Sequence, residues 1–213
     1  MYKTLGFKWL IEAFCPTSAF VSADSVEAHN PQRFIHVTVG GHAKMKTTEL
    51  HKRYFIAEQK LIDQYENQFD LVNRDETNWT ATYMDKETGD EWLSYRVDPE
   101  YHGGGNPVMC RLPLPDTTKL IDIALQTENE DEVFAACRTL VNNEQLKKTD
   151  FRSDLISRIE NLKNKERQKR IIELTGLDSD LNRREIIGKT SDQVDKDSKY
   201  FQDIAKKAMK LKK

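Results

Sequence analysis

Residues 79–97 read Trp79-Thr-Ala-Thr-Tyr-Met-Asp-Lys-Glu-Thr-Gly-Asp-Glu-Trp-Leu-Ser-Tyr-Arg-Val97. Apolar and polar side chains alternate in the first five residues and again in the last five, which is the period of a β-strand. The segment between them is acidic and contains Gly89, which can adopt the positive φ that a tight turn requires. This stretch therefore predicts an antiparallel β-hairpin, with Trp92 at the start of its second strand.

A glycine-rich loop and a further short strand follow the hairpin. The loop ends in the run His102-Gly-Gly-Gly-Asn-Pro107, and residues 108–112 then alternate as in a third strand. Glycines lack a Cβ and let the backbone pass very close to another backbone segment or to an aromatic ring. We therefore interpret the three glycines as structural, with His102 orienting the loop by a hydrogen bond.

The segment before the hairpin has a helical period. Its apolar residues recur at intervals of three and four, which traces one face of a helix: they are Leu50, Tyr54, Ala57, Leu61, Tyr65 and Phe69. Thr48 is placed to cap the N-terminus of that helix. We expect one helix of about six turns over residues 48–69. Residues 33–39 are rich in β-branched side chains and predict a strand.

After Pro113 and Pro115 the pattern is helical to the end of the chain. Helix N-caps are expected at Asp116, at Asn129 with Glu132 as a capping box, and at Asp150. Short helices joined by brief loops predict stacked helical hairpins. In the tail an apolar stripe predicts a basic helix that either docks or stays solvated and frayed; its residues are Phe201, Ile204, Ala208 and Leu211.

These patterns predict an α+β fold with a small antiparallel sheet and a long packed helix, followed by a C-terminal all-helical region of stacked short helices. We divide the chain into an α+β domain over residues 1–112, a helical region over 113–176 and a charged tail over 177–213.

Composition favours a protein of a reducing compartment. The chain has three widely spaced cysteines, which form no disulfide framework and no zinc motif. The sequence contains no run of eighteen apolar residues that would span a membrane. We therefore expect a cytoplasmic protein.

Charge is distributed unevenly along the chain. The formal net charge is −2, but residues 60–146 carry 18 Asp or Glu against 7 Lys or Arg, whereas residues 147–213 carry 12 against 19. Such a separation can steer a charged partner or attract the other half of the same chain.

No enzyme class is supported by a complete motif. The triple glycine after His102 is similar to oxyanion-hole strings of α/β-hydrolases, but no G-x-S-x-G nucleophile elbow accompanies it. Gly188-Lys-Thr190 lacks the earlier glycine of a P-loop. The five histidines show no i, i+4 pair of the kind that binds zinc, and nothing selects a catalytic pair among the carboxylates. We expect no catalytic residue, no metal and no cofactor.

The hairpin, its loop and the expected helix resemble the immunity protein 27 family over roughly residues 48–112. The positions that match that family's pattern are Trp79, Tyr83, Asp85, Gly89, Trp92, Tyr95, His102, Gly103, Gly104, Gly105 and Pro107. The resemblance implies a bacterial immunity protein that neutralises a polymorphic toxin by binding and occluding it, without catalysis.

The acidic middle of the chain agrees with a basic toxin, such as a nuclease, because complementary charge speeds association. The candidate contacts are Asp63, Glu66, Asp70, Asp85, Asp90, Glu130, Asp131 and Glu132. Aromatic residues around the hairpin either cover a small sheet or form a binding platform. The alternative function is a helical scaffold that binds a peptide or nucleic acid through its basic C-terminal face, although interleaved acids disfavour nucleic acid. The sequence assigns no oligomeric state.

Overall fold

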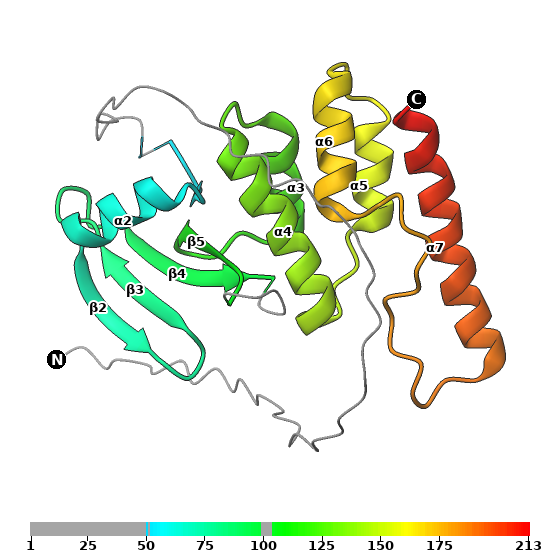
Figure 1. The fold of residues 1–213 in the computed structure, drawn as a ribbon, viewed down its shortest axis with the longest axis horizontal. Coiled ribbons are helices and arrows are strands. Elements are labelled where there is room, and N and C mark those ends of the chain that lie inside the picture. The colour runs from blue at the N-terminus through cyan, green and yellow to red at the C-terminus, as the bar shows by residue number, and fades with distance from the viewer. Residues whose placement is uncertain (1–49, 51, 99–103) are drawn as a thin grey trace, which may run out of the picture. The chain divides into compact units, whose positions relative to one another are not determined.

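A computed structural model describes residue 50 and residues 52–98 and 104–213 of the chain (Figure 1). The strand expected at 33–39, the cap at Thr48, His102 and Gly103 lie outside the described residues. The fold is α+β, as the sequence predicted, and about 50% of the described residues are helical and 16% are in strands.

Among the described residues, positions 55–111 form a five-stranded antiparallel sheet together with one helix. The strand order of the sheet is β1-β5-β4-β3-β2. Its strands are β1 (Phe55–Ile56), β2 (Asp70–Asp75), β3 (Thr80–Met84), β4 (Glu91–Val97) and β5 (Asn106–Arg111). Helix α2 (Gln59–Gln68) follows β1. The expected hairpin is confirmed as β3 and β4, in which Tyr83 pairs with Trp92, and the third strand is confirmed as β5.

The turn of the hairpin is built on Asp85. Its carboxylate accepts the backbone N–H of Glu87 at 2.9 Å and the hydroxyl of Thr88 at 3.0 Å, and Gly89 follows with φ 75°. Asp85 is only 3% exposed. This acid therefore shapes the turn by satisfying local donors, as Asp residues commonly do in turns.

The prediction of a single helix over residues 48–69 is wrong. Residues 55–56 form strand β1, and α2 starts only at Gln59. The cause lies far along the chain. The carboxylate of Glu132 accepts the backbone N–H groups of Tyr54 and Phe55 at 2.7 and 3.1 Å, and Asp131 accepts that of Ala57 at 3.2 Å. These N–H groups are thus bonded to α4 and do not enter a helical ladder.

Strand β2 was not anticipated from the sequence. Five of its six residues are exposed, so no alternation of apolar and polar side chains marks it. Its pairing with β3 also shifts register between Leu71 and Asn73, which places a β-bulge at Val72.

The second half consists of α3 (Thr117–Gln126), α4 (Glu130–Lys147), α5 (Arg152–Ile159), α6 (Lys165–Thr175) and α7 (Ser191–Leu211). The Asp116 cap is confirmed, since its carboxylate accepts the N–H of Lys119 at 2.7 Å. The capping box at Asn129 is wrong. The Asn129 side chain instead donates to Glu132 at 3.0 Å. The expected cap at Asp150 is wrong by one residue, because Phe151 is the N-cap of α5; the Asp150 carboxylate just before it accepts the N–H of Arg152 at 3.0 Å.

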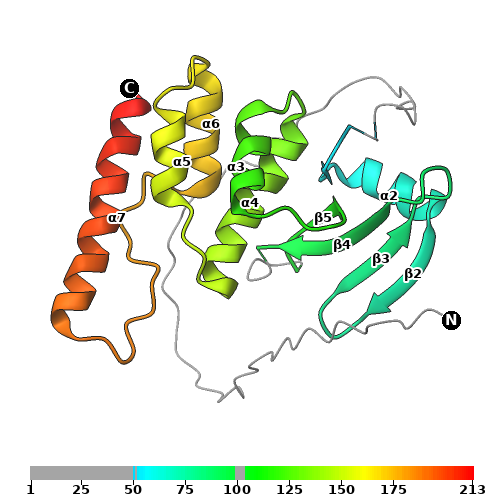
Figure 2. The same ribbon diagram turned by 180° about the vertical axis from the view of Figure 1, so that it is seen from behind.

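Helix α7 docks and is longer than the expected tail helix. Thr190 and Gln193 form a capping box at its start, and Phe201, Ile204 and Ala208 are buried. It packs against α5 and α6 (Figures 1 and 2). The apolar stripe therefore marks a buried helix face. Among the described residues, no helix is long and apolar enough to cross a membrane.

Two clusters of buried residues lie on opposite faces of the sheet. On one face α2 packs Ile62 and Tyr65 against Tyr83 and Trp92. On the other face α4 packs against the sheet, and the Tyr95 hydroxyl lies 2.8 Å from the hydroxyl of Thr139. This second cluster joins buried residues of β1, β4 and β5 to buried residues of α3, α4, α5, α6 and α7. The sheet and the C-terminal helices therefore share this cluster.

Candidate functional site

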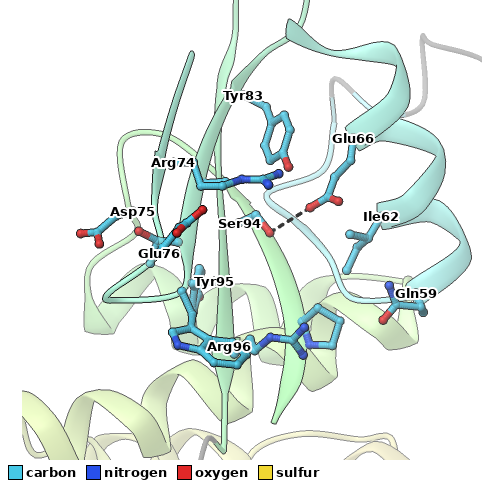
Figure 3. Close-up of a pocket in the computed structure, with 14 residues that line it drawn as sticks. Gln59, Ile62, Glu66, Arg74, Asp75, Glu76, Tyr83, Ser94, Tyr95 and Arg96 are labelled. Atoms are coloured by element: carbon cyan, nitrogen blue, oxygen red, sulfur yellow. Dashed lines mark hydrogen bonds between the residues drawn. The ribbon is translucent and has the colours of Figure 1, made fainter. Parts of the chain in front are cut away.

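A groove of about 450 Å³ lies between α2 and the part of the sheet that α2 leaves uncovered (Figure 3). It is lined by Gln59, Ile62, Glu66, Arg74, Asp75, Glu76, Trp79, Thr80, Ala81, Tyr83, Ser94, Tyr95, Arg96 and Pro107. The antiparallel register explains the groove. Arg74, Ala81 and Ser94 are paired across three neighbouring strands and so point to the same face.

Polar groups converge inside the groove. The Ser94 hydroxyl donates to the Glu66 carboxylate at 3.2 Å, which joins α2 to β4 (Figure 3). Tyr83 is 4% exposed, and burial raises the pKa of its hydroxyl, with Arg74 and Glu66 close to it. The tyrosine is therefore a neutral hydrogen-bonding group between a cation and an anion. This combination can recognise a polar or charged side chain that enters the groove.

Trp79 contributes an exposed aromatic ring at the groove. Its side chain is 65% exposed, and its backbone has φ 54°, which is uncommon for a bulky residue. The Arg96 guanidinium lies 5.8 Å from the ring centroid. Gly104 lies against the same ring, because a Cβ at that position would be 3.5 Å from the ring atom Cζ3. Trp79 is therefore held by its neighbours while most of its surface faces solvent.

Gly105 supports this arrangement by a very close backbone contact. A Cβ at residue 105 would lie 2.3 Å from the carbonyl oxygen of Val97, and its φ is 82°. Its own carbonyl accepts a hydrogen bond of 3.1 Å from Arg96. The prediction that glycines permit close approach to backbone and aromatic ring is confirmed for Gly104 and Gly105.

The described residues of the hairpin-and-loop motif therefore divide into two groups, one at the groove and one in the hairpin turn and core. Trp79, Tyr83, Tyr95 and Pro107 line the groove, and Gly104 and Gly105 support its aromatic side. Asp85 and Gly89 build the hairpin turn, and Trp92 is 1% exposed beneath α2. The sequence did not single out Arg74, Asp75, Glu76, Ser94 or Arg96. The alternation in β4 places Ser94 and Arg96 on one face and was the only signal for them.

Several acids expected at a binding surface are used within the fold. Asp85 and Glu132 are each 3% exposed, and Glu132 also accepts the Thr127 hydroxyl at 2.6 Å. Asp131 pairs with Arg53, and Glu130 pairs with Arg167 at 2.9 Å. Asp85 and Glu132 are thus removed from the candidate surface, because their carboxylates already accept internal donors.

The remaining acids lie nearer the groove and the hairpin. Glu66 lines the groove, whereas Asp63 accepts the Gln59 amide at 2.7 Å on the exposed side of α2. Asp70 pairs with Lys86 at 2.7 Å, and Asp90 lies 3.6 Å from Arg111. The Asp70–Lys86 pair is largely exposed, and such a pair contributes little to stability. The carboxylate of Asp70 can therefore exchange partners at small cost.

Asp75 is held as a carboxylate at the end of β2. The side chain and backbone N–H of Asn78, together with the N–H of Thr77, lower its pKa. A carboxylate that stays ionised in this way supplies fixed negative charge to the groove and is a poor general acid.

The two described cysteines, Cys110 and Cys137, are buried. Burial raises the pKa of Cys110 and of Cys137 to about 12, so both thiols are protonated near neutral pH. Within residues 50, 52–98 and 104–213, no group of three His, Cys, Asp or Glu side chains is placed to hold a metal ion.

Comparison of the chain with protein-family models, with curated proteins and with solved structures finds no match.

Proposed function

We propose that this chain is a non-catalytic immunity protein that binds a cognate bacterial toxin domain and occludes it through the groove beside α2. The observation that carries the proposal is Trp79, a large aromatic side chain that is 65% exposed yet held between Arg96 and Gly104. Tryptophan is one of the three residue types, with tyrosine and arginine, that are enriched among the side chains that dominate binding energy at protein interfaces.

The charge around the groove supports a basic partner. From Glu58 to Glu91 the chain carries ten carboxylates and three Lys or Arg residues, a net charge of −7. This segment contributes α2, β2 and β3, which line the groove, and also the hairpin turn at residues 85–90, which does not line it (Figure 3). A potential of that sign attracts a cationic domain, and toxins that cleave nucleic acid are of this kind because their substrate is anionic.

The groove also offers recognition groups of both signs. Glu66 and Glu76 can accept from a basic side chain, and Arg74 and Arg96 can donate to a carboxylate or backbone carbonyl. The partner therefore supplies the inserted side chain, and Trp79 covers it.

Co-expression with the toxin domain encoded beside this gene tests the proposal. The wild-type chain should restore growth and form a stable one-to-one complex with that toxin. Trp79→Ala should weaken the complex by at least tenfold, because truncation of a central aromatic anchor costs about 2 kcal/mol or more. Leu146→Ala is the matched control, since Leu146 is 70% exposed at the far end of α4. Failure to rescue growth together with absence of a complex would reject the proposal.

A second candidate function rests on α7. Its exposed side bears Lys206, Lys207 and Lys210, which could bind an acidic peptide or nucleic acid. The same helix has Asp192 in its first turn and Lys210 in its last turn. The helix dipole favours an acid at the N-terminus and a base at the C-terminus, so the position of Lys210 has an explanation that needs no bound partner. The groove therefore supports toxin binding more strongly than α7 supports binding of an acidic peptide or nucleic acid.

A further inference from the structure

Within the described residues, strand β2 forms one edge of the sheet. Among the described strands it pairs only with β3, and it lies last in the sheet order (Figure 1). The opposite edge, β1, has two residues, and the N–H groups of Tyr54, Phe55 and Ala57 are bonded to carboxylates of α4. The β2 edge is therefore the place where another strand can add to this sheet.

Exposed apolar side chains are concentrated beside this edge. Leu71 and Val72 are 50% and 51% exposed, and Met84, which pairs with Asp70, is 37% exposed. With Trp79 they make four of the ten large hydrophobic side chains that are exposed in the described residues, all within the β2–β3 hairpin. Natural edge strands are usually protected by lysine, proline or covering elements. This edge has Arg74 and the bulge at Val72, but it presents aliphatic surface at its centre.

We infer that β2 is a docking edge that pairs with an extended, basic strand of the partner protein. The inference rests on the proposed function and specifies how the toxin is held. Backbone groups of an edge strand supply affinity by forming a new ladder, and side chains at alternate positions supply specificity.

Acidic residues at both ends of β2 indicate the charge of the added strand. Asp70 starts the strand, Asp75 ends it, and Glu76 follows directly after it. Glu76 and Asp75 also line the groove. A Lys or Arg on the α2-facing side of the added strand therefore lies next to the groove carboxylates, where opposite charges across strands are favourable.

The same charges argue against a second copy of this chain and against nucleic acid. Antiparallel pairing of two β2 strands about the strand centre would set Asp70 of one copy opposite Asp75 of the other, and like charges at paired positions are destabilising. A nucleic acid would meet the net charge of −7 carried by residues 58–91. A basic polypeptide strand is the occupant that satisfies both the backbone and the charge.

Hydrogen exchange on the complex with an inactive form of the neighbouring toxin domain tests this inference. The amides of residues 70–75 that do not already bond to β3 should exchange at least tenfold more slowly in the complex than in the free chain. Amides of β4, which is internal to the sheet, should change little. A binding variant gives a second measurement. Val72→Lys places a cation on the edge and should weaken binding at least tenfold, whereas Leu146→Lys adds the same charge elsewhere and should not.

The outcomes separate this inference from the proposed function. A complex that forms while residues 70–75 keep their free exchange rates would overturn the docking edge and leave the immunity function standing. Concentration-dependent self-association with protection of residues 70–75 would overturn it in favour of a second copy. Absence of any complex would overturn both. Unchanged exchange of β4 in Val72→Lys establishes that the variant is folded.

Discussion

The carboxylate of Glu132 on α4 accepts the backbone N–H of Phe55 on β1 at 3.1 Å, across 77 residues of chain. It also accepts the N–H of Tyr54, the hydroxyl of Thr127 and the amide of Asn129. One buried side chain thereby links the β1 edge of the sheet to α4 and to the connection between α3 and α4.

We expect Glu132→Ala to lower the free energy of unfolding by about 3 kcal/mol, because it leaves buried N–H donors without an acceptor. Urea denaturation followed by circular dichroism measures the change. Glu128→Ala is the control, since Glu128 is exposed four residues earlier and should cost less than about 0.5 kcal/mol. Equal effects of the two substitutions would contradict the structural role of Glu132.

Gly105 and Gly89 form a second matched pair. Both have positive φ, but a Cβ at Gly105 would lie 2.3 Å from the Val97 oxygen, whereas a Cβ at Gly89 meets nothing within 4 Å. Gly89→Ala should therefore cost only the backbone term of about 1 kcal/mol. Gly105→Ala should cost roughly 3 kcal/mol or more, because backbone must also shift. Thermal denaturation of both variants tests the ranking, and a smaller loss for Gly105→Ala would contradict it.

The Arg152–Glu144 pair should show the energetics of a buried ion pair. Arg152 is fully buried and donates to the two Glu144 oxygens at 2.6 and 2.8 Å and to the Gly176 carbonyl at 3.2 Å. Arg152→Met leaves a buried carboxylate unpaired and should cost about 3–5 kcal/mol.

The double variant Arg152→Met with Glu144→Leu removes both charges and should be more stable than Arg152→Met alone. A double-mutant cycle in urea gives the coupling between the two residues. Additive losses would show that the two side chains do not stabilise each other.

Asp197 should make stability depend on acid pH. Hydrogen bonds from Lys189 at 2.5 Å and Arg184 at 2.7 Å lower its pKa. Because the folded pKa is below the unfolded one, the stabilisation is present above the ordinary carboxyl pKa and is lost as pH falls through the lowered value. Asp197→Asn should cost about 1 kcal/mol at pH 7, since the partners are partly exposed. The difference from wild type should vanish in strong acid, as acid-dependent urea titrations would show. A difference that grew toward low pH would contradict the assignment.

The basic side of α7 provides the test between the two candidate functions. Replacement of Lys206, Lys207 and Lys210 by Glu should leave toxin binding within about twofold, because contacts outside the centre of an interface contribute little. Fluorescence anisotropy with a labelled DNA duplex over a range of salt concentrations measures the competing function. Duplex binding that falls steeply with salt and is lost in the triple variant would favour the scaffold function.

Local patterns predicted the parts of the fold that depend on neighbouring residues. The β3–β4 hairpin follows from alternation and a turn glycine, and the Asp116 cap follows from one side chain near the N–H groups it satisfies. The apolar stripe of α7 correctly marked a helix face, although it did not show whether that face was covered. In each case the interacting groups lie within a few residues of one another, so their spacing along the chain is enough.

Long-range contacts account for what the pattern of residues could not show. Residues 54–57 have helical spacing, yet carboxylates of α4 about 75 residues away bind their N–H groups and produce β1. Strand β2 has no alternation because it lies at an exposed edge and is defined by pairing with β3.

The groove joins α2, the end of β2 and the middle of β4, which sequence alone leaves up to 37 residues apart, from Gln59 to Arg96. The chemical types of the groove residues can be read from the sequence. Their convergence arises from the register of the sheet and from the packing of α2. Only folding sets Glu66 beside Ser94, because a hydrogen bond between distant residues depends on the position of both backbones.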